Sequence, residues 1–268
     1  MATYLDRILD VHRRVAADDD RRLDALIDGT GALCASRGFA EALLAAPDGQ
    51  AAVVAEVKRR SPSRGDLAAD LDPGSIAVEY VGGGAACLSV LTDVDHFGGS
   101  SGDLRVARSA VAVPVLRKDF TVDARDVCDA RLMGADAVLL IAAALDDAEL
   151  ADFHALALEV GLDALVEIHD EAELERALVV DARLVGVNQR DLVTFEVDTA
   201  RAVRMAPRMP EAVVRVAESG IRGPDDARTL VRAGYHALLV GESVVTSDDR
   251  AAAVRALRGV ANGPSDGG

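Results

Sequence analysis

The chain has 268 residues, of which 50% are hydrophobic and only 3% aromatic, and it contains no tryptophan. This apolar content is enough for a sizeable core, which Ala, Val and Leu must supply. The formal net charge of −16 argues against nucleic acid or an anionic membrane surface as the main partner, because both are negatively charged. With no apolar run of about 18 residues and no signal-peptide pattern, we expect a soluble, cytoplasmic protein.

Lysine is almost absent from the chain. Only two of the 29 basic residues are lysines, Lys58 and Lys118, and all the others are arginines. A lysine amine is compact and gives up a proton when its surroundings lower its pKa, whereas arginine stays charged. Both lysines follow short apolar runs, as does Asn188, one of two asparagines. We interpret these three residues as retained for chemistry.

The three cysteines, Cys34, Cys87 and Cys128, lack the spacing of metal ligands. Two of them lie in apolar or helical runs, so we predict buried thiols in a reducing compartment. We predict no metal site and no cofactor.

The N-terminal segment predicts two helices before the first strand. Residues 2–17 carry apolar side chains at helical spacing, and residues 39–46 form a second helical stretch that ends at a Pro-Asp-Gly turn. We expect both helices to pack across one end of the fold. His12, on the first helix, is interpreted as a histidine with its hydrogen bonds satisfied rather than as a ligand.

Short apolar runs then recur at intervals that leave room for a loop, a helix and a loop. Eight predicted strands begin near Val53, Cys87, Val113, Ala137, Ala164, Leu184, Val213 and Ala237. Glycines that would close a preceding helix in the left-handed conformation stand before four of them, at Gly84, Gly134, Gly161 and Gly234. Between strands, residues 146–160 and 170–179 have helical periodicity, and Pro224 is placed to begin another helix.

Eight strand-then-helix units with apolar strands indicate an α/β fold whose parallel sheet is covered on both faces. Within about 200 residues they favour a closed (β/α)8 TIM barrel with additional N-terminal helices. We predict one domain over residues 1–260, including a helical extension over about 1–50, and a disordered tail over 261–268. A doubly wound open sheet is the alternative, but its dinucleotide-binding fingerprint is missing.

The active site of such a barrel lies at the carboxyl ends of its strands, and polar side chains stand at these ends. The residues that could transfer protons there are Glu56, Lys58, Lys118 and Glu167, and Asn188 ends the sixth strand. An apolar pocket beside the lysines would lower the pKa of an amine towards the working range.

The ends of the last two strands predict a phosphate site. Ser219-Gly220 and Gly241-Glu242 stand where barrels often bind phosphate through backbone N–H groups. Glu242 is interpreted as exposed and as contributing its N–H group. The loop over residues 61–65, which includes Ser61, is placed to close this site.

Other polar residues at the same rim have two interpretations. Asp93 and Asp119 are either functional or loop and cap residues, and His96 is either a loop residue or a substrate contact. His169 and Asp170 fit a strand exit and a helix cap, so His169 is not assigned as a base.

Nine short motifs occur in an order that resembles indole-3-glycerol-phosphate synthase. They include Glu-Val-Lys-x-x-Ser-Pro-Ser, Arg-Lys-Asp-Phe and Leu-Val-Glu-Ile-His, and together they cover residues 56–63, 89–93, 96–104, 117–120, 134–141, 165–169, 186–192, 218–221 and 240–243. Any one motif is weak, but nine in this order are specific, and the resemblance extends from about Leu5 to Val245.

This resemblance implies a (β/α)8 barrel with extra N-terminal helices over the active-site end. It implies ring closure, decarboxylation and dehydration of 1-(2-carboxyphenylamino)-1-deoxyribulose 5-phosphate in tryptophan biosynthesis, by a carboxy-lyase without a cofactor. The implied partner is this small phosphorylated molecule, with no nucleic acid and no membrane, and the implied oligomeric state is a monomer.

The resemblance also implies roles for the residues named above. Lys118 would be the general acid that activates the ribulose carbonyl, Lys58 would contact the anthranilate carboxylate, and Glu167 would be the general base or cation stabiliser. Glu56 and Asn188 would orient hydroxyls and lysines. The implied phosphate ligands are Ser61, Ser219, Gly220, Gly241 and the Glu242 backbone, with Arg190 supporting the rim and Phe120 walling the aromatic pocket.

Two departures from the family pattern stand out. Gln189 occupies a position where the family usually has asparagine, and the loop over residues 92–95 differs from the expected versions. Two other hypotheses remain open. A phosphoribosylanthranilate isomerase would need a cysteine and aspartate acid–base pair, but Cys87 begins its strand. A barrel that binds an anionic ligand without turnover would have lost one of the four lysines and glutamates.

Overall fold

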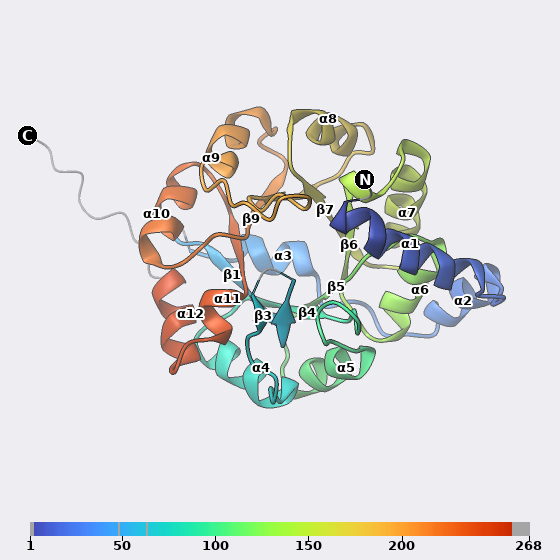
Figure 1. Cartoon of the computed structure of the whole chain (residues 1–268), viewed down its shortest axis with the longest axis horizontal. Coiled ribbons are helices and arrows are strands. Elements are labelled where there is room, and N and C mark those ends of the chain that lie inside the picture. The colour runs from blue at the N-terminus through green and yellow to red at the C-terminus, as the bar shows by residue number, and fades with distance from the viewer. Residues whose placement is uncertain (1–2, 48, 63, 259–268) are drawn as a thin grey trace, which may run out of the picture.

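Eight parallel strands form a closed barrel in the order β1-β10-β9-β8-β7-β6-β5-β4, and helices surround it (Figure 1). The computed structural model describes residues 3–47, 49–62 and 64–258, so the predicted disordered tail lies outside the described residues. The barrel strands are β1 (Ala52–Val57), β4 (Cys87–Leu91), β5 (Val115–Lys118), β6 (Ala137–Ile141), β7 (Asp163–Ile168), β8 (Leu184–Asn188), β9 (Val214–Glu218) and β10 (Ala237–Val240). Each begins within two residues of the predicted start, and the predicted fold class is confirmed.

The strand register aligns the carboxyl ends of neighbouring strands. Ile141 pairs with Glu167, and Asn188 pairs with Glu218. Because all strands are parallel, these ends meet at one rim of the barrel, where their polar side chains can converge.

Helices follow the strands as the periodicity predicts. They are α4 (Pro73–Gly82), α5 (Ser101–Ala110), α6 (Ala124–Leu132), α7 (Asp147–Glu159), α8 (Glu171–Val179), α9 (Arg201–Met205), α10 (Pro224–Arg232), α11 (Glu242–Val245) and α12 (Arg250–Arg258). Asp146 and Asp170 cap α7 and α8 by accepting backbone N–H bonds, which satisfies donors that a helix start leaves free. The four glycines before strands have φ between 80° and 98°, the left-handed conformation predicted for them.

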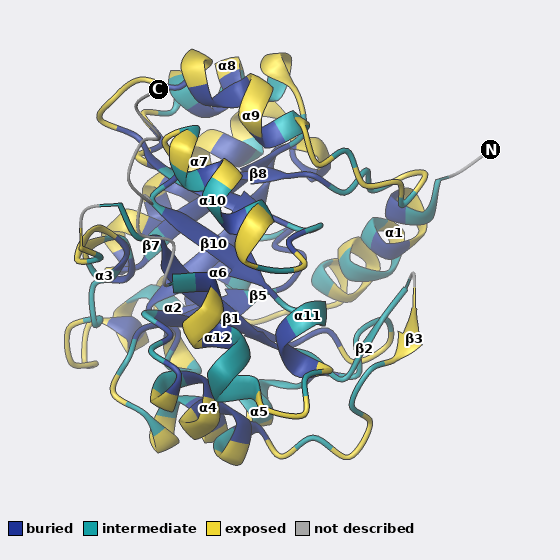
Figure 2. Cartoon of the chain, turned by 90° about the vertical axis from the view of Figure 1, so that its left-hand side faces the viewer, coloured by how far each residue is buried: buried dark blue, intermediate teal, exposed yellow. Residues whose placement is uncertain are grey.

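The N-terminal segment forms three helices, α1 (Tyr4–Ala17), α2 (Leu23–Thr30) and α3 (Phe39–Leu44), of which α2 was not predicted. The expectation that the predicted helices share one end of the fold is wrong. The α1 helix lies at the carboxyl ends of the strands, while α3 packs at the opposite end (Figure 2). There the Ala40 N–H donates to Asp163 at the start of β7. The α2 helix packs against α6 and carries the chain from one end to the other.

Apolar residues form two clusters. One lies between the barrel and its surrounding helices, and the other fills the barrel interior with side chains such as Leu116, Leu139 and Leu165. The interior cluster also takes in Leu5 of α1 and Phe39 of α3, so the two helices close opposite ends of the same core. Because the barrel interior is filled with apolar side chains, we expect the active site at the polar rim on the α1 end.

A short hairpin follows β1, where a loop was predicted. Its strands are β2 (Arg60–Ser61) and β3 (Gly65–Asp66), and it stands at the same end of the barrel as α1 (Figure 2). Cys87 and Cys128 are buried as predicted, and Cys34 is exposed. Among the described residues, none of the helices has both the length and the apolar character needed to span a bilayer.

Candidate active site

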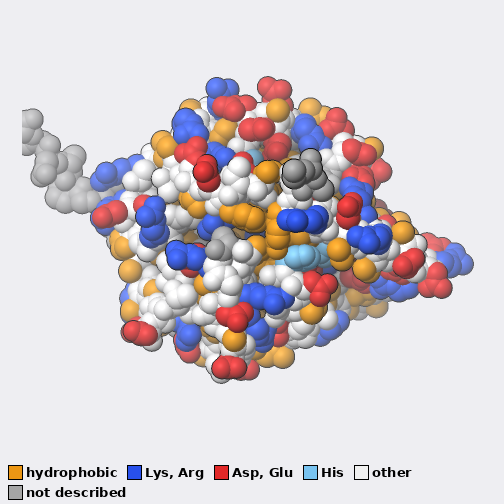
Figure 3. All heavy atoms as spheres, viewed as in Figure 1, with side chains coloured by type: hydrophobic (Ala, Val, Ile, Leu, Met, Phe, Trp, Pro, Cys, Tyr) orange, Lys and Arg blue, Asp and Glu red, His pale blue; other side chains and the backbone are white. Residues whose placement is uncertain are grey.

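A pocket of about 450 Å³ opens at the carboxyl ends of the strands. The view onto this end shows hydrophobic side chains gathered in the middle of the face with charged ones around them (Figure 3). All twelve residues expected at the site line this one pocket: Glu56, Lys58, Ser61, Lys118, Phe120, Glu167, Asn188, Arg190, Ser219, Gly220, Gly241 and Glu242. The structure therefore brings together side chains that the sequence spreads over almost 190 residues.

Lys118 lies at the bottom of the pocket among carboxylates. Its Nζ donates to Glu167 Oε2 at 2.9 Å and lies 3.6 Å from Glu218 Oε2. Asn188 Nδ2 donates to the other oxygen of Glu167 at 3.0 Å, so the Glu167 carboxylate is held on both sides. Both carboxylates are buried, which strengthens their interaction with the ammonium group.

These contacts set the protonation states at the bottom of the pocket. Burial favours a neutral Lys118, but the charges of Glu167, Glu218 and Glu56 outweigh it and raise the lysine pKa above its ordinary value. Burial likewise opposes ionisation of Glu167, yet Lys118, His169 and Asn188 hold the pKa of that carboxyl below its usual range. Burial and the neighbouring Glu167 charge raise the pKa of Glu218 to about 8.

The prediction that the pocket lowers the pKa of the lysine amine is wrong for Lys118. The walls are apolar, but three carboxylates lie near the amine, and their charge outweighs desolvation. Lys118 is therefore a charged ammonium group, and the group poised to change protonation near neutral pH is Glu218.

A second ion pair occupies the end of β1. Lys58 and Glu56 point to the same side, as their spacing predicted, and the Lys58 ammonium donates to the Glu56 carboxylate. Gly241 faces this pair closely: a Cβ atom at Gly241 would collide with the Glu56 carboxylate and lie 2.9 Å from Lys58 Nζ. A Cβ atom there would force the Glu56 and Lys58 side chains to move, so glycine lets the last strand approach the first while leaving the ion pair in place.

The adjoining part of the pocket wall combines Ser219, Gly220 and Gly241. Ser219 has φ 63°, a left-handed conformation that is uncommon for a residue with a side chain, and Gly220 has φ 71°. Gln189 is buried, and its Nε2 donates to the Ser219 carbonyl oxygen at 2.8 Å. The longer glutamine side chain thus helps to fix the strained turn after β9. Consecutive backbone N–H groups in such turns form concave sites for anions.

The hairpin after β1 reaches this wall. Arg64 Nη2 lies 2.8 Å from Glu242 Oε1, so Glu242 is half-buried and paired, contrary to the prediction that it is exposed. The Ser61 hydroxyl is buried, has no hydrogen-bond partner among the residues that the structure describes, and lines the same pocket. A buried hydroxyl in the pocket that also contains the Ser219 turn is available to a phosphate oxygen.

Aromatic side chains wall the other part of the pocket. Phe120 and Phe97 lie 6.4 Å apart, and Tyr4 of α1 meets Phe195 edge to face at 5.0 Å between ring centroids. Arg190 Nη1 donates to the Phe195 carbonyl oxygen at 3.2 Å, which ties the guanidinium to the loop after β8. A flat apolar ring fits this wall.

Sequence reasoning missed several residues of the site. Glu218, the last residue of β9, was not assigned to the site, although a glutamate near a strand end was the signal that singled out Glu56 and Glu167. Tyr4, Leu5 and Ile8 of α1 roof the pocket, which helical periodicity alone does not reveal.

The structure gives contacts for the rim residues that had two interpretations. Asp93 accepts the backbone N–H bonds of His96 and Phe97, and Asp119 accepts from Arg117 at 3.1 Å, so both organise loops, and both also line the pocket. His96 bonds Asp93. His169 bonds Glu173 and lies 3.6 Å from Glu167, and it is not among the described residues that line the pocket.

Comparison with known proteins identifies the family. The family model described as indole-3-glycerol phosphate synthase matches residues 5–257. The chain belongs to this family. An indole-3-glycerol phosphate synthase from Nocardioides sp. is 55% identical over 208 residues, 78% of this chain and 80% of that protein. Another from Leptothrix cholodnii is 48% identical over 260 residues, 96% of this chain and 99% of that protein.

Solved structures with low sequence identity share the fold of this synthase-family chain. A 3-hexulose-6-phosphate synthase superimposes with a TM-score of 0.61 at 16% identity, covering 78% of this chain and 99% of that one. A thiamine phosphate pyrophosphorylase from Pyrococcus furiosus gives a TM-score of 0.59 at 18% identity, covering 78% and 94%. At these identities the similarity concerns the barrel alone.

Proposed function

We propose that this chain converts 1-(2-carboxyphenylamino)-1-deoxyribulose 5-phosphate into indole-3-glycerol phosphate, with release of one CO2 and one water. Membership of the family supports the overall reaction. The roles proposed for individual residues rest on one observation, the Lys118 ammonium group among three carboxylates beneath an apolar wall. The reaction is a carbon–carbon lyase step with no net oxidation, so acid–base groups suffice for it.

Lys118 is the general acid of the first step in this proposal. The aromatic carbon that bears the carboxylate attacks the ribulose carbonyl, and the developing alkoxide takes a proton from the Lys118 ammonium group. Its contact with Glu167 aims the amine into the pocket, and the neighbouring charges keep it protonated until a stronger base, the alkoxide, forms. CO2 then leaves, and the electrons of its bond restore the aromatic ring.

Dehydration needs an acid at the departing hydroxyl and a base at the carbon next to nitrogen. Lys58 is placed to bind the anthranilate carboxylate and then to protonate the hydroxyl, with Glu56 orienting its ammonium group. Glu167, ionised and held by Asn188, is the base and stabilises the cation formed on the nitrogen side. Glu218, with its raised pKa, is the group that can return a proton to Lys118.

The phosphate is placed at the part of the pocket formed by Ser219, Gly220 and Gly241. Support comes from the turn at Ser219 and Gly220, the unpartnered Ser61 hydroxyl and the backbone at Gly241 and Glu242. Phosphate binding there would supply binding energy remote from the reacting carbons and orient the ribulose chain over the lysines.

The test is turnover of the synthetic substrate by the purified chain, followed by indole fluorescence and CO2 release. Equal amounts of product and CO2 are expected. A substrate without phosphate should show a strongly raised KM, because it loses the anion contacts. A folded protein that binds the substrate and releases neither product would favour the barrel that binds without turnover.

We also propose that the chain works as a monomer in the cytoplasm. The exposed large hydrophobic side chains lie on separate elements, such as Val15 on α1, Val78 on α4 and Val179 on α8. The buried free thiols of Cys87 and Cys128 suit a reducing compartment. Light scattering coupled to size-exclusion chromatography measures the oligomeric state directly.

A further inference from the structure

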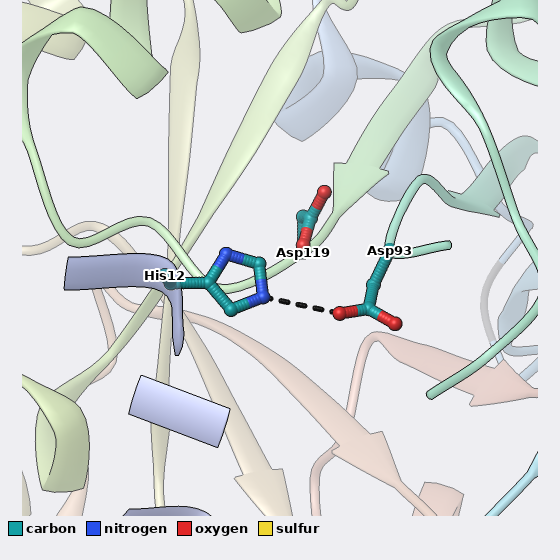
Figure 4. A group of neighbouring side chains, drawn as sticks. All are labelled: His12, Asp93 and Asp119. Atoms are coloured by element: carbon teal, nitrogen blue, oxygen red, sulfur yellow. Dashed lines mark hydrogen bonds and ion pairs between the residues drawn. The ribbon is translucent and has the colours of Figure 1, made fainter. Parts of the chain in front are cut away.

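One histidine fastens α1 to the barrel rim. His12 Nε2, in the third turn of α1, lies 3.0 Å from Asp93 Oδ2, just beyond the end of β4 (Figure 4). The Asp93 carboxylate is almost entirely buried and the His12 side chain is 21% exposed. The two residues are 81 positions apart in the sequence, so this contact exists only in the folded barrel.

The same carboxylate organises part of the aromatic wall. Asp93 Oδ1 accepts the backbone N–H groups of His96 at 2.6 Å and Phe97 at 3.1 Å, and His96 Nδ1 lies 3.1 Å from Oδ2. The Phe97 ring faces Phe120 at 6.4 Å, and the His12 ring itself lies 5.4 Å from Phe120. The buried Asp93 carboxylate therefore connects α1 to the Phe97 backbone, and both the His12 and Phe97 rings lie next to Phe120.

His12, Asp93 and Asp119 have the composition of a metal site and lie close together in Figure 4. Their oxygens are already engaged, however. Asp119 accepts from Thr92, from Arg117 and from the Phe120 N–H group, and Asp93 accepts four contacts from His12, His96 and the loop backbone. A cation would have to displace several of these bonds beside the positive charge of Arg117. The arrangement is that of a satisfied polar contact rather than an ion site.

We propose that His12 is a positioning residue for the aromatic part of the substrate, acting through Asp93. The His12–Asp93 contact holds α1 in the position where Tyr4, Leu5 and Ile8 line the pocket. Asp93 also holds the loop that carries Phe97. His12 does not line the pocket and takes no part in the chemistry. This inference rests on the proposed function, because it concerns how the same pocket binds its substrate.

The charges around His12 make the contact depend on pH. The groups that face it are Asp93 and His96 from the β4 end, Asp119 and its partner Arg117 from β5, and Asp126 from α6. Burial disfavours the imidazolium ion, but the Asp93 bond and the charges of Asp119 and Asp126 outweigh it and raise the pKa of His12 above its ordinary value of 6.5. The charge-assisted contact is therefore complete below pH 6.5 and is lost as pH rises through the raised pKa.

The experiment compares KM and kcat of the parent with those of His12→Ala and His12→Gln between pH 6 and pH 9. A charged, largely buried hydrogen bond predicts a KM about tenfold higher in His12→Ala at pH 6, with kcat within about threefold of the parent. His12→Gln, which keeps a donor without a charge, should recover part of the loss. Because a charge-assisted bond is roughly twice as strong as a neutral one, the parent KM should rise about fivefold across the titration, and the variants should lack this rise.

Arg13→Gln is the matched control. Arg13 also fastens α1 to the barrel, through bonds of 2.6 Å and 2.9 Å to Glu149, but it does not titrate in this range. This variant should keep the pH-dependent rise in KM. The Kd of indole-3-glycerol phosphate, read from its own fluorescence in a chain without tryptophan, should follow KM in every variant.

Three results would overturn the proposal. They are an unchanged KM and Kd in both His12 variants, a pH-dependent rise that persists in His12→Gln, or a fall in kcat with KM unchanged, which would place His12 in the chemistry. Asp93→Asn keeps a side-chain oxygen that can accept the backbone N–H groups but removes the negative charge, and it must also flatten the rise if His12→Ala fails to fold. Failure of the proposed function would appear differently, as no turnover in the parent.

Discussion

Replacement of Lys118 distinguishes proton donation from simple charge stabilisation. The ammonium group lies 2.9 Å from Glu167 and 3.6 Å from Glu218, and its pKa is raised, so it is fully charged in the free enzyme. In Lys118→Arg the positive charge and the ion pair with Glu167 survive, but the guanidinium group is a much poorer proton donor. In Lys118→Met the charge is gone as well.

The expected loss follows from these contacts. A positioned general acid contributes about 10² to 10⁴ in rate, so both variants should lose about 10³-fold in kcat, or about 4 kcal/mol of transition-state stabilisation. Their stabilities should differ, however. Lys118→Arg should unfold within about 1 kcal/mol of the parent, whereas Lys118→Met leaves buried carboxylates without a counter-charge and should cost about 3 to 5 kcal/mol.

The assay is the fluorescence of the indole product, which the chain does not mask because it has no tryptophan. Thermal unfolding and circular dichroism establish that each variant is folded before its rate is compared. If Lys118→Arg retains activity within about tenfold of the parent, charge alone suffices and the general-acid role is refuted. If only Lys118→Met loses activity, Lys118 acts as an electrostatic group.

Three further predictions concern the rest of the site. Glu218→Gln should gain stability relative to the parent as pH rises from 5 to 9, by up to about 4 kcal/mol. The parent loses stability over this range because Glu218 has a raised pKa in the folded protein but ionises near its ordinary pKa of 4.5 when unfolded. The melting temperature of both proteins at each pH measures this difference. Gly241→Ala should lower kcat/KM at least about tenfold, since its Cβ collides with the Glu56 carboxylate, and should cost about 1 to 3 kcal/mol on denaturant unfolding. Ser219→Gly should raise the free energy of unfolding by about 1 kcal/mol through relief of the left-handed strain, yet raise KM for the phosphorylated substrate by loosening the turn.

Each of these has a result that contradicts it. A stability difference between Glu218→Gln and the parent that does not change with pH would mean that Glu218 ionises normally. Gly82→Ala is the control for Gly241, because a Cβ at Gly82 meets no atom of the described part of the chain within 4 Å. Equal effects of the two variants would remove the collision argument. A destabilised Ser219→Gly would show that the serine hydroxyl outweighs the strain of its backbone.

Much of the fold follows from local patterns in the sequence. Strand starts were predicted within two residues because apolar runs, helix caps and closing glycines are decided by neighbouring residues. Lys58 and Lys118 were found through their scarcity, and the closed parallel topology brings such strand ends to one rim. The remaining pocket residues were predicted from the family motifs.

Other features depend on contacts between distant segments. Nothing in the local pattern separates α1 from α3, which share an amphipathic character but close opposite ends of the barrel. The hairpin after β1 and the pairing of Arg64 with Glu242 likewise depend on how two strand ends meet.

The sequence determined which residues stand at the strand ends, because periodicity, turn chemistry and composition are local properties of the chain. Only the tertiary structure decided their protonation and their partners. The raised pKa of Lys118 comes from carboxylates on three other strands, and His12 meets Asp93 across 81 residues. Electrostatic energies depend on distances in space that barrel closure creates, so no local pattern could give their sign.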